Sequence, residues 1–397
     1  MYNFELSKAA DDLMLGMFGV KKNENVVITC DTLSNMDVVE ACAASVYKVG
    51  AFPTVMKIAA PDCVGKATDP QIPVKVLTGA IMEADVWLEL NKQWIQYSSV
   101  YEYCEEHNKK LRYMCLVGYD AERMVRTISK VEREKLAVFM KATRDLHLKA
   151  KKMRITTPAG TDVHFELDHN NYFACDCGEA NVPGMHMLTG QLNVVPKLNT
   201  VNGTIVYDGC IDPPFSRIPN TPVRLTVENS KIVAIDGGSE AVEFKKYLEA
   251  FGDPNMLKMA HVAYGFNTGA QMTGYIVEDE RVWGCTEWGI GYVSPTDLPP
   301  YGQDAISHCD GLCVNSSVWL DDRQIMDEML EKHHIIISGS LGDLKGKLMR
   351  IGHMGNNANV TDVKNTLSAL TQVLQAHDIP VKEDMGEAFV RCIEEME

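Results

Sequence analysis

The amino-acid sequence predicts an α/β N-terminal domain with a parallel sheet, then a β-rich α+β domain, then a small α/β appendage. Three observations support this prediction. Apolar runs alternate with amphipathic segments over residues 1–150, strand-like alternation with glycine turns fills residues 151–330, and the pattern changes again over residues 331–397. A chain of 397 residues is also longer than one hydrophobic core usually organises, so we expect several domains.

The first domain is predicted from four apolar runs that are typical of buried strands. They are NVVITC (25–30), PTVMKIA (53–59), DVWLEL (85–90) and RYMCLVG (112–118). Segments with helical spacing lie between them, at residues 36–51, 74–84 and 99–111. This alternation predicts a parallel sheet covered by helices. Because no G-x-G-x-x-G follows the first strand, we interpret the domain as a scaffold or substrate gate, not a nucleotide site.

The second domain begins after a charged helix expected over residues 131–152. Four later segments show strand alternation with glycine turns. They span residues 152–168, 203–212, 223–238 and 281–293. The appendage is predicted as strand, turn, strand and helix, with Thr361 as the helix cap. Its apolar positions at helical spacing are Val363, Leu367, Leu370, Val373 and Leu374.

The charge and composition of the chain limit the kinds of molecule that it is expected to bind. The net charge of −16 argues against nucleic acid and against anionic membrane surfaces, so a small-molecule substrate or another protein remains as the expected partner. No apolar run is long enough to span a bilayer and the first residues do not resemble a signal peptide, so we expect a cytoplasmic protein. Twelve cysteines are scattered, and neither Cys175/Cys177 nor Cys309/Cys313 has CxxC spacing, so we interpret them as reduced packing residues.

A metal site is suggested by His308 and Asp310 in the predicted strand ISHCDGLCV. Residues two apart on a strand face the same side, so the imidazole and the carboxylate project together. His261, where we expect a helix to run into a glycine turn, would complete two histidines and one carboxylate. That set holds Fe(II) in non-haem oxygenases and also suits Zn or Mn. A lone histidine is nevertheless more often a hydrogen-bonded core or surface residue.

Six motifs in a fixed order resemble the aminopeptidase T-like metallopeptidases and their relatives, the 2,5-dihydroxypyridine 5,6-dioxygenases. The motifs are RITTPAGTD (154–162), EANVPG (179–184), GTIVYDG (203–209), AHVAYGFNTGA (260–270), GCTEWGIG (284–291) and SHCDGLCV (307–314). The resemblance runs from about residue 25 to residue 330 and implies a metalloenzyme.

The two branches imply different ligands. The peptidase branch holds two metals through two glutamates and a histidine, at positions that are His186, His261 and Glu287 here. Without those carboxylates, two close dications would repel each other. The dioxygenase branch implies one metal held by His261, His308 and Asp310. It therefore implies one divalent metal, Fe(II) favoured over Zn, Mn or Co, and ring-cleaving dioxygenation of a small hydroxylated N-heteroaromatic such as a dihydroxypyridine.

Three further residues are catalytic candidates. His186 and Glu179 lie in the loop-like segment CDCGEANVPGMHM, as a base or a substrate contact, with a surface role as the alternative for Glu179. Glu287 would orient a histidine ligand or act as an extra ligand. The stretch LELNKQWIQYSS lacks a histidine that the dioxygenase resemblance leads us to expect. A metal-dependent hydrolase, either aminopeptidase or amidase-like, and a non-catalytic binding protein therefore remain open alternatives.

The tail has a resemblance of its own. Residues 341–374, with the motif R-I-G-H-M-G, resemble the C-terminal segment of class V, alanine-glyoxylate-type aminotransferases. That resemblance implies that Arg350 binds a substrate carboxylate, as a planar bidentate donor can. Nothing in residues 1–330 resembles the large PLP domain, so no PLP is expected. The alternative is that the tail packs on the main body or mediates assembly, and a homo-oligomer is expected.

Overall fold

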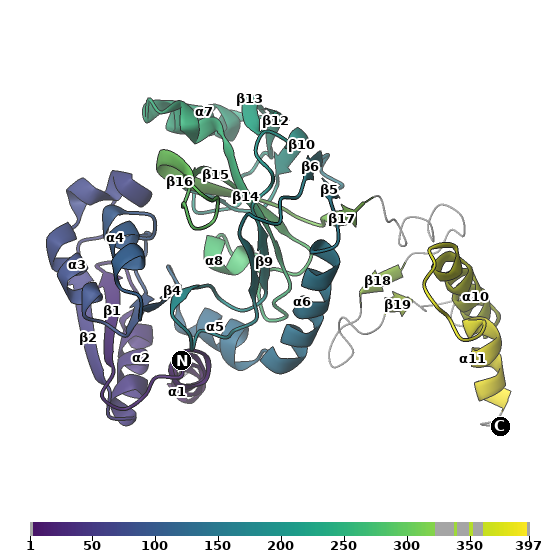
Figure 1. Cartoon of the computed structure of the whole chain (residues 1–397), viewed down its shortest axis with the longest axis horizontal. Coiled ribbons are helices and arrows are strands. Elements are labelled where there is room, and N and C mark those ends of the chain that lie inside the picture. Colours follow the sequence, from purple (N-terminus) through teal and green to yellow (C-terminus); the bar gives the residue numbers. More distant parts are fainter. Residues whose placement is uncertain (1–2, 322–336, 340–348, 352–359, 395–397) are drawn as a thin grey trace. The chain divides into compact units, whose positions relative to one another are not determined.

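The computed structural model describes residues 3–321, 337–339, 349–351 and 360–394. The chain divides into two compact units, Met1–Leu320 and Asp321–Glu397 (Figure 1). No helix in these described ranges is both long enough and apolar enough to cross a bilayer.

The first unit contains the predicted parallel sheet, with five strands in the order β2-β1-β3-β4-β8 (Figure 1). They are β2 (Phe52–Ile58), β1 (Asn25–Asp31), β3 (Val86–Glu89), β4 (Arg112–Cys115) and β8 (Gly184–His186). β3 and β4 are buried along their whole length, as expected. β2 was expected to be buried but is largely exposed, because it is an edge strand with one neighbour. β8 comes from well beyond residue 150 and pairs with β4 in parallel.

Helices and short helical turns connect these strands. They are α1 (Asn3–Asp11), η1 (Asp12–Met17), α2 (Met36–Lys48), η2 (Gly65–Gln71), α3 (Val74–Met82), α4 (Ser99–His107), α5 (Ala121–Met124), η3 (Val125–Ser129) and α6 (Arg133–His147). Side-chain caps explain where three of them begin: Asn35 accepts from the first turn of α2, Ser98 from that of α4 and Asp120 from that of α5. The predicted bridging helix is α6.

Two antiparallel sheets make up the rest of this unit. One has the order β13-β12-β10-β6-β5-β17, and the other β11-β16-β15-β14-β9-β7. The first comprises β13 (Lys231–Asp236), β12 (Val223–Glu228), β10 (Asn202–Tyr207), β6 (Asp162–Glu166), β5 (Lys152–Thr156) and β17 (Ser317–Leu320). The second comprises β11 (Ile211–Asp212), β16 (Gln303–Cys313), β15 (Thr286–Val293), β14 (Met259–Gly265), β9 (Gln191–Val194) and β7 (Phe173–Asp176). The helical segments here are α7 (Ser239–Ala250), η4 (Pro254–Leu257) and α8 (Ile276–Asp279).

The centre of the second antiparallel sheet is buried away from solvent. All eight residues of β15 are buried between β14 and β16. Trp288 on β15 packs edge-on against Phe165 of the other antiparallel sheet, so the inner faces of both sheets share one apolar core. Polar side chains on β14, β15 and β16 are therefore held in a low-dielectric environment, where each needs a partner.

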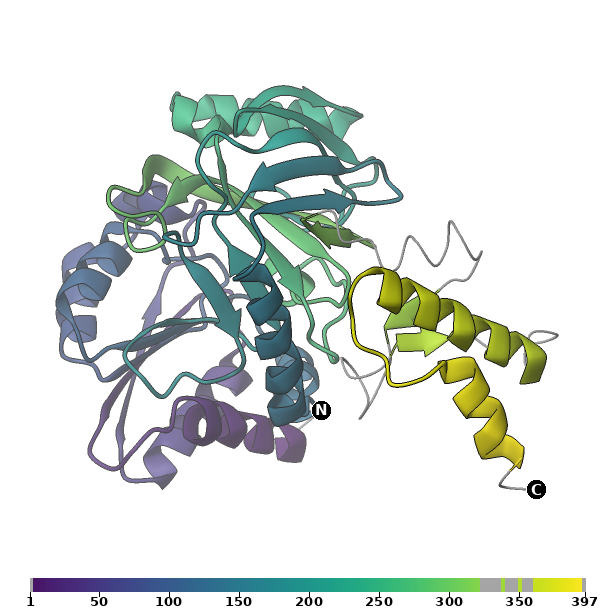
Figure 2. The same ribbon diagram turned by 45° about the vertical axis from the view of Figure 1, so that its right-hand side comes forward.

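The second unit has the predicted order of two strands and a helix. β18 (Ile337–Gly339) pairs with β19 (Met349–Ile351) in antiparallel fashion. α10 (Val360–Ala376) and α11 (Met385–Glu394) contact each other through a small apolar cluster that includes Leu370 and Met385 (Figure 2). α10 begins at Val360, so Thr361 lies inside its first turn and is not its cap as predicted. Arg350 lies on β19 opposite Ser338, and its side chain is outside the described part of the structure.

Candidate metal centre

Three residues from two strands converge at one point. His261 comes from β14, whereas His308 and Asp310 come from β16, and their ligand atoms all lie within 4.8 Å of one another. His261 was expected near a helix, but the preceding helical segment is only η4, and His261 itself is on a strand. The register between β14 and β15 shifts at this residue. Such a bulge re-aims a side chain, here towards the two residues of β16.

Gly289 on β15 makes room for this convergence. It lies opposite Asp310 on the strand between the two that carry the histidines. A Cβ atom at Gly289 would lie 2.6 Å from His261 Cε1, closer than side-chain carbons approach. The His261 and His308 rings can therefore stack above this position, with centroids 5.1 Å apart and planes tilted by 17°. The absent side chain is thus a requirement of the site.

The hydrogen bonds of His308 orient its ring. Its Nδ1 lies 2.9 Å from the Tyr292 carbonyl oxygen, which can only accept, so Nδ1 carries the proton. Nε2 then faces Asp310 Oδ1 at 2.9 Å. A neutral ring would direct its lone pair at a carboxylate oxygen, which is repulsive unless a proton or a cation lies between them. Burial opposes the charging of His308, but the neighbouring Asp310 outweighs it and raises the pKa of His308.

His261 cannot supply that positive charge itself. Its Nε2 lies 3.7 Å from Asp310 Oδ1 and 3.0 Å from Glu287 Oε2. Burial, together with the nearby His308, lowers the pKa of His261 to about 4. At neutral pH it is therefore an uncharged imidazole with an available lone pair.

Glu287 is the least satisfied group of the cluster. Its side chain is 0% exposed, and apart from His261 and Asp310 its oxygens have no partner among the described residues. Burial, with the charge of Asp310 adding to it, raises the pKa of Glu287 well above its usual range. An unsatisfied carboxylate beside two imidazoles and a second carboxylate is a donor set that suits Fe, Zn or Mn. Ligand atoms about 2.1 Å from one cation lie roughly 3 Å apart at neighbouring positions, and the His308–Asp310 and His261–Glu287 distances of 2.9 and 3.0 Å match this spacing.

His261, His308 and Asp310 line a small cavity of about 40 Å³. Aromatic side chains at its wall are Trp94 and Tyr97, from the loop after β3, and Tyr172. The Tyr97 ring centroid is 5.0 Å from that of His308. Asp176 from β7 is a polar group in the same wall; its Oδ2 has no hydrogen-bond partner in the described structure, and burial raises its pKa to about 7. A cavity that combines aromatic walls with many polar side chains, among them Gln96, Gln191 and Asn193, is suited to a small planar molecule with polar substituents.

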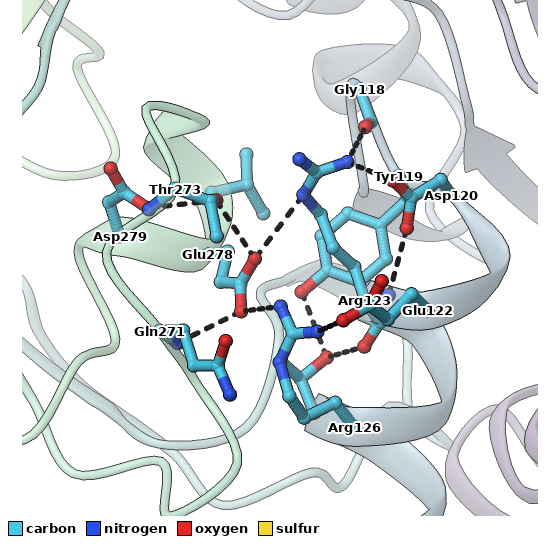
Figure 3. A network of polar contacts seen from close by, with 12 residues as sticks. Gly118, Tyr119, Asp120, Glu122, Arg123, Arg126, Gln271, Thr273, Glu278 and Asp279 are labelled. Atoms are coloured by element: carbon cyan, nitrogen blue, oxygen red, sulfur yellow. Dashed lines mark hydrogen bonds and ion pairs between the residues drawn. The ribbon is translucent and has the colours of Figure 1, made fainter. Parts of the chain in front are cut away.

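One wall of the cavity is α8, through Ile276, Val277 and the neighbouring Glu280. Glu278 of α8 points the other way and is 0% exposed (Figure 3). Its carboxylate meets Arg126 Nη2 at 2.5 Å and Arg123 Nε at 3.2 Å. The backbone N–H of Gln271 and the hydroxyl of Thr273 donate to it at 2.9 and 3.0 Å. α8 is thereby tied to α5 and η3, and the cavity wall is held in place.

The other sequence candidates lie away from this cavity. His186 is on β8, and its Nε2 contacts the Val182 carbonyl oxygen at 2.7 Å. Its neighbours Met185 and Met187 line the cavity instead, as strand alternation requires. Glu179 is exposed and pairs with Lys141 at 3.1 Å. Sequence reasoning missed Asp176, although an acidic residue in an apolar strand was a usable signal.

The comparisons with known proteins agree with this geometry. Residues 9–329 match the family model described as 2,5-dihydroxypyridine 5,6-dioxygenase. A curated protein of that name from Pseudomonas putida KT2440 is 28% identical over 197 residues, which cover 47% of this chain and 54% of the relative. The matched segment thus spans about half the length of this relative.

Two solved structures share the fold. The 2,5-dihydroxypyridine dioxygenase structure from Pseudomonas putida KT2440 matches with a TM-score of 0.66 and 20% identity, over 81% of this chain and 95% of that chain. Wild-type AmpT from Thermus thermophilus matches with a TM-score of 0.55 and 13% identity, over 81% of this chain and 96% of that chain. At these identities the structural matches establish the fold alone.

Proposed function

This chain belongs to the 2,5-dihydroxypyridine 5,6-dioxygenase family, and on that premise we propose that it is a mononuclear metalloenzyme that opens the ring of a small hydroxylated N-heteroaromatic such as a dihydroxypyridine. The resemblance noted in the sequence is confirmed by the family match. One observation carries the proposal of activity. Two imidazoles and a carboxylate converge beside an unsatisfied buried carboxylate, at the wall of an aromatic cavity.

We propose that His261, His308 and Asp310 hold one Fe(II). When bound, the metal would supply a redox-active Lewis-acid centre that brings a substrate hydroxyl and O₂ together. The Tyr292 carbonyl keeps the Nε2 atom of His308 free for this role. Glu287, at 3.0 Å from His261 Nε2, would orient that ring or add a ligand.

The chain's other groups would position the substrate and take up its proton. Trp94, Tyr97 and Tyr172 offer ring faces to a flat heterocycle. Asp176, with its pKa of about 7, has the proton affinity expected of a base that removes a ring hydroxyl proton near neutral pH. We assign this role to Asp176 and not to His186 or Glu179, because only Asp176 lines the cavity.

Metal analysis combined with oxygen uptake tests the proposal. The protein would be purified without oxygen, loaded with Fe(II) and supplied with 2,5-dihydroxypyridine. We expect one iron per chain and substrate-dependent O₂ consumption. His308→Ala should lose both, with turnover reduced about 100-fold or more. His164→Ala, an exposed histidine on β6, is the matched control and should retain both.

Other results would point to a different enzyme. Two metals per chain, with Zn- or Co-dependent hydrolysis of leucine p-nitroanilide and no O₂ uptake, would identify a hydrolase instead. A chain that retains no metal after anaerobic purification would contradict both enzymes.

The role of the tail is a separate proposal. We propose that Arg350 contacts a carboxylate of the substrate, so Arg350→Ala should raise KM for a carboxylated heterocycle and leave KM for an uncharged one unchanged. A homo-oligomer and a cytoplasmic location are proposed from the acidic composition and the appended unit alone. Sedimentation of the full chain beside a chain ending at Leu320 would test assembly.

A further inference from the structure

Two thiols lie in contact just behind the cavity wall. Cys175 on β7 and Cys177 directly after it have their Sγ atoms 3.3 Å apart. Cys175 is partly exposed, and Cys177, although buried, keeps an exposed fraction of 7%, so neither thiol is sealed from solvent. All twelve cysteines of the chain are free thiols in the structure. This pair has no part in the metal centre.

The surroundings favour a thiolate at Cys177. A hydrogen bond from Cys175 lowers the pKa of Cys177, and the positive charge of Lys141 adds to the effect. The same hydrogen bond and burial raise the pKa of Cys175, so Cys177 is the thiol of the pair that ionises first. Arg144, one turn from Lys141 on α6, adds a second positive charge near Cys175. A thiolate beside basic residues and a partner thiol is the arrangement typical of reactive cysteines.

The strand geometry links this pair to the cavity. Asp176 lies between the two cysteines, and side chains alternate along β7, so Ala174 and Asp176 line the cavity while the thiols face away from it. A disulfide requires the sulfurs to approach from 3.3 Å to about 2.05 Å, and backbone movement that accompanies this approach falls on the short segment between them. β7 is an edge strand of its sheet and, among the described strands, pairs with β9 alone, so it can yield. Because Asp176 lies between the two cysteines, a backbone movement in this segment would shift Asp176.

We propose that Cys175 and Cys177 form a redox-active dithiol that low-molecular-weight disulfides oxidise to an intrachain disulfide, displacing Asp176 in the cavity wall. In the first step the Cys177 thiolate attacks one sulfur of glutathione disulfide, and one glutathione leaves as thiolate. In the second, Cys175 loses its proton and attacks Cys177 Sγ, and the second glutathione leaves. Two electrons pass from the dithiol to the reagent, which ends as two glutathione thiols.

Peptide mapping of the full chain tests the chemistry. Reduced protein would be incubated with oxidised glutathione without oxygen, alkylated and digested with trypsin. Residues 155–197 form one tryptic peptide that contains both cysteines and no other. We expect this peptide to lose two hydrogen atoms and to accept no alkyl group. Cys392, which is exposed, should carry glutathione in the same digest and serves as the control for the reagent.

Single variants distinguish the two thiols. In Cys175→Ser the peptide should stop at one bound glutathione on Cys177, because the resolving thiol is absent. In Cys177→Ser it should react at least about 10-fold more slowly. The proposal is overturned if the wild-type peptide accepts two alkyl groups while Cys392 is fully modified, or if Cys175→Ser traps no glutathione.

Hydrogen exchange and turnover test separately whether the disulfide displaces Asp176 in the cavity wall. Hydrogen exchange at β7 should increase in the oxidised protein, return to its reduced level with dithiothreitol and stay unchanged in the Cys175→Ser/Cys177→Ser double variant. This measurement does not depend on any turnover. The effect on turnover rests on the proposed function, and an oxidised enzyme should then be slowed in step with disulfide content. Unchanged exchange and unchanged turnover in the disulfide form would refute the displacement of Asp176.

Discussion

Two buried glutamates nine positions apart meet very different surroundings. Glu278 and Glu287 both have side chains that are 0% exposed. Glu278 lies between two arginines and accepts two further hydrogen bonds (Figure 3). Glu287 instead contacts His261, whose pKa is lowered to about 4, and the acidic residue Asp310. Burying a carboxylate without a partner is costly. The charge of Glu278 is compensated by its two arginines, so we interpret Glu278 as a structural residue. Glu287 has no arginine or lysine in contact among the described residues, and burial raises its pKa.

Glu89 is an intermediate case. The Tyr113 hydroxyl donates to its carboxylate at 2.6 Å and the Ile95 N–H at 2.7 Å, but neither donor is charged. Burial accordingly raises the pKa of Glu89 to about 7 in spite of these bonds. Hydrogen bonds from neutral groups thus satisfy the oxygens without fully stabilising the charge. Glu278, Glu89 and Glu287 therefore form a series of buried glutamates with charged, neutral and no fully compensating partners. We infer that the type of partner determines whether the residue stabilises the fold or is available to a ligand.

The largest expected effect is at Glu278. Glu278→Gln would leave Arg123 and Arg126 without their shared anion, and the free energy of unfolding should fall by about 3–5 kcal/mol. Urea denaturation of the metal-free protein would measure it. Glu166→Gln removes the exposed partner of Lys197 and is the control, for which we expect little change. A change at Glu278 no larger than at Glu166 would contradict the structural role.

Glu287→Gln should behave in the opposite way. It replaces a buried acid, whose pKa burial raises, by a neutral amide of similar size, so the metal-free protein should be equally stable or more stable. Affinity for Fe(II) should fall by about 10- to 100-fold, because an anion next to His261 is lost. Competition with a chelator would measure the affinity. Unchanged affinity together with a large loss of stability would show that Glu287 is only structural.

Gly289→Ala tests the space between the histidines. The new Cβ would force the His261 ring to move, and we expect metal affinity to fall by about 10-fold while the fold is kept. Gly79→Ala in α3 is the matched control, since nothing lies within 4 Å of the added atom. Equal metal affinity in the two variants would mean that the histidines do not need this space.

The smallest expected effect is on the pH dependence of the free energy of unfolding. Because the pKa of Glu89 is raised on folding, the folded state holds a proton that the unfolded state has released above its ordinary pKa of 4.5. The stability contributed by this group is therefore present below pH about 4.5 and lost as pH rises towards 7. Glu89→Gln should remove a slope of about 1 kcal/mol per pH unit between pH 5 and 7. Denaturation at several pH values in metal-free buffer would measure it, and an unchanged slope would contradict it.

Local patterns were sufficient for much of the fold. Apolar runs predicted the central strands β1, β3 and β4, and the two-residue spacing of His308 and Asp310 predicted that they project together, as they do. The strand that carries His261 was not predictable, because an apolar run of this length fits a helix as well as a buried strand. The bulge that aims His261 depends on pairing with β15, which no local pattern encodes.

Long-range features escaped prediction for the same reason. Asp176 and Cys175 acquire their surroundings only when β7 pairs with β9 and α6 packs nearby. The exposure of β2 depends on its place at the sheet edge and not on its own residues. Family resemblance correctly placed the chain, but it also drew attention to His186 and Glu179, which lie away from the cavity.

The return of the chain to its first sheet through β8 has a consequence for the order of folding. Met114 on β4 pairs with His186 on β8, so this contact closes a loop of about 70 residues. The flanking residues Met185 and Met187 belong to the cavity wall. Parallel pairing over such a separation forms slowly compared with local helices and hairpins. On a ribosome the cavity therefore cannot close until residues far beyond the first four strands have emerged, and a nascent chain exposes the edge of β4 until then.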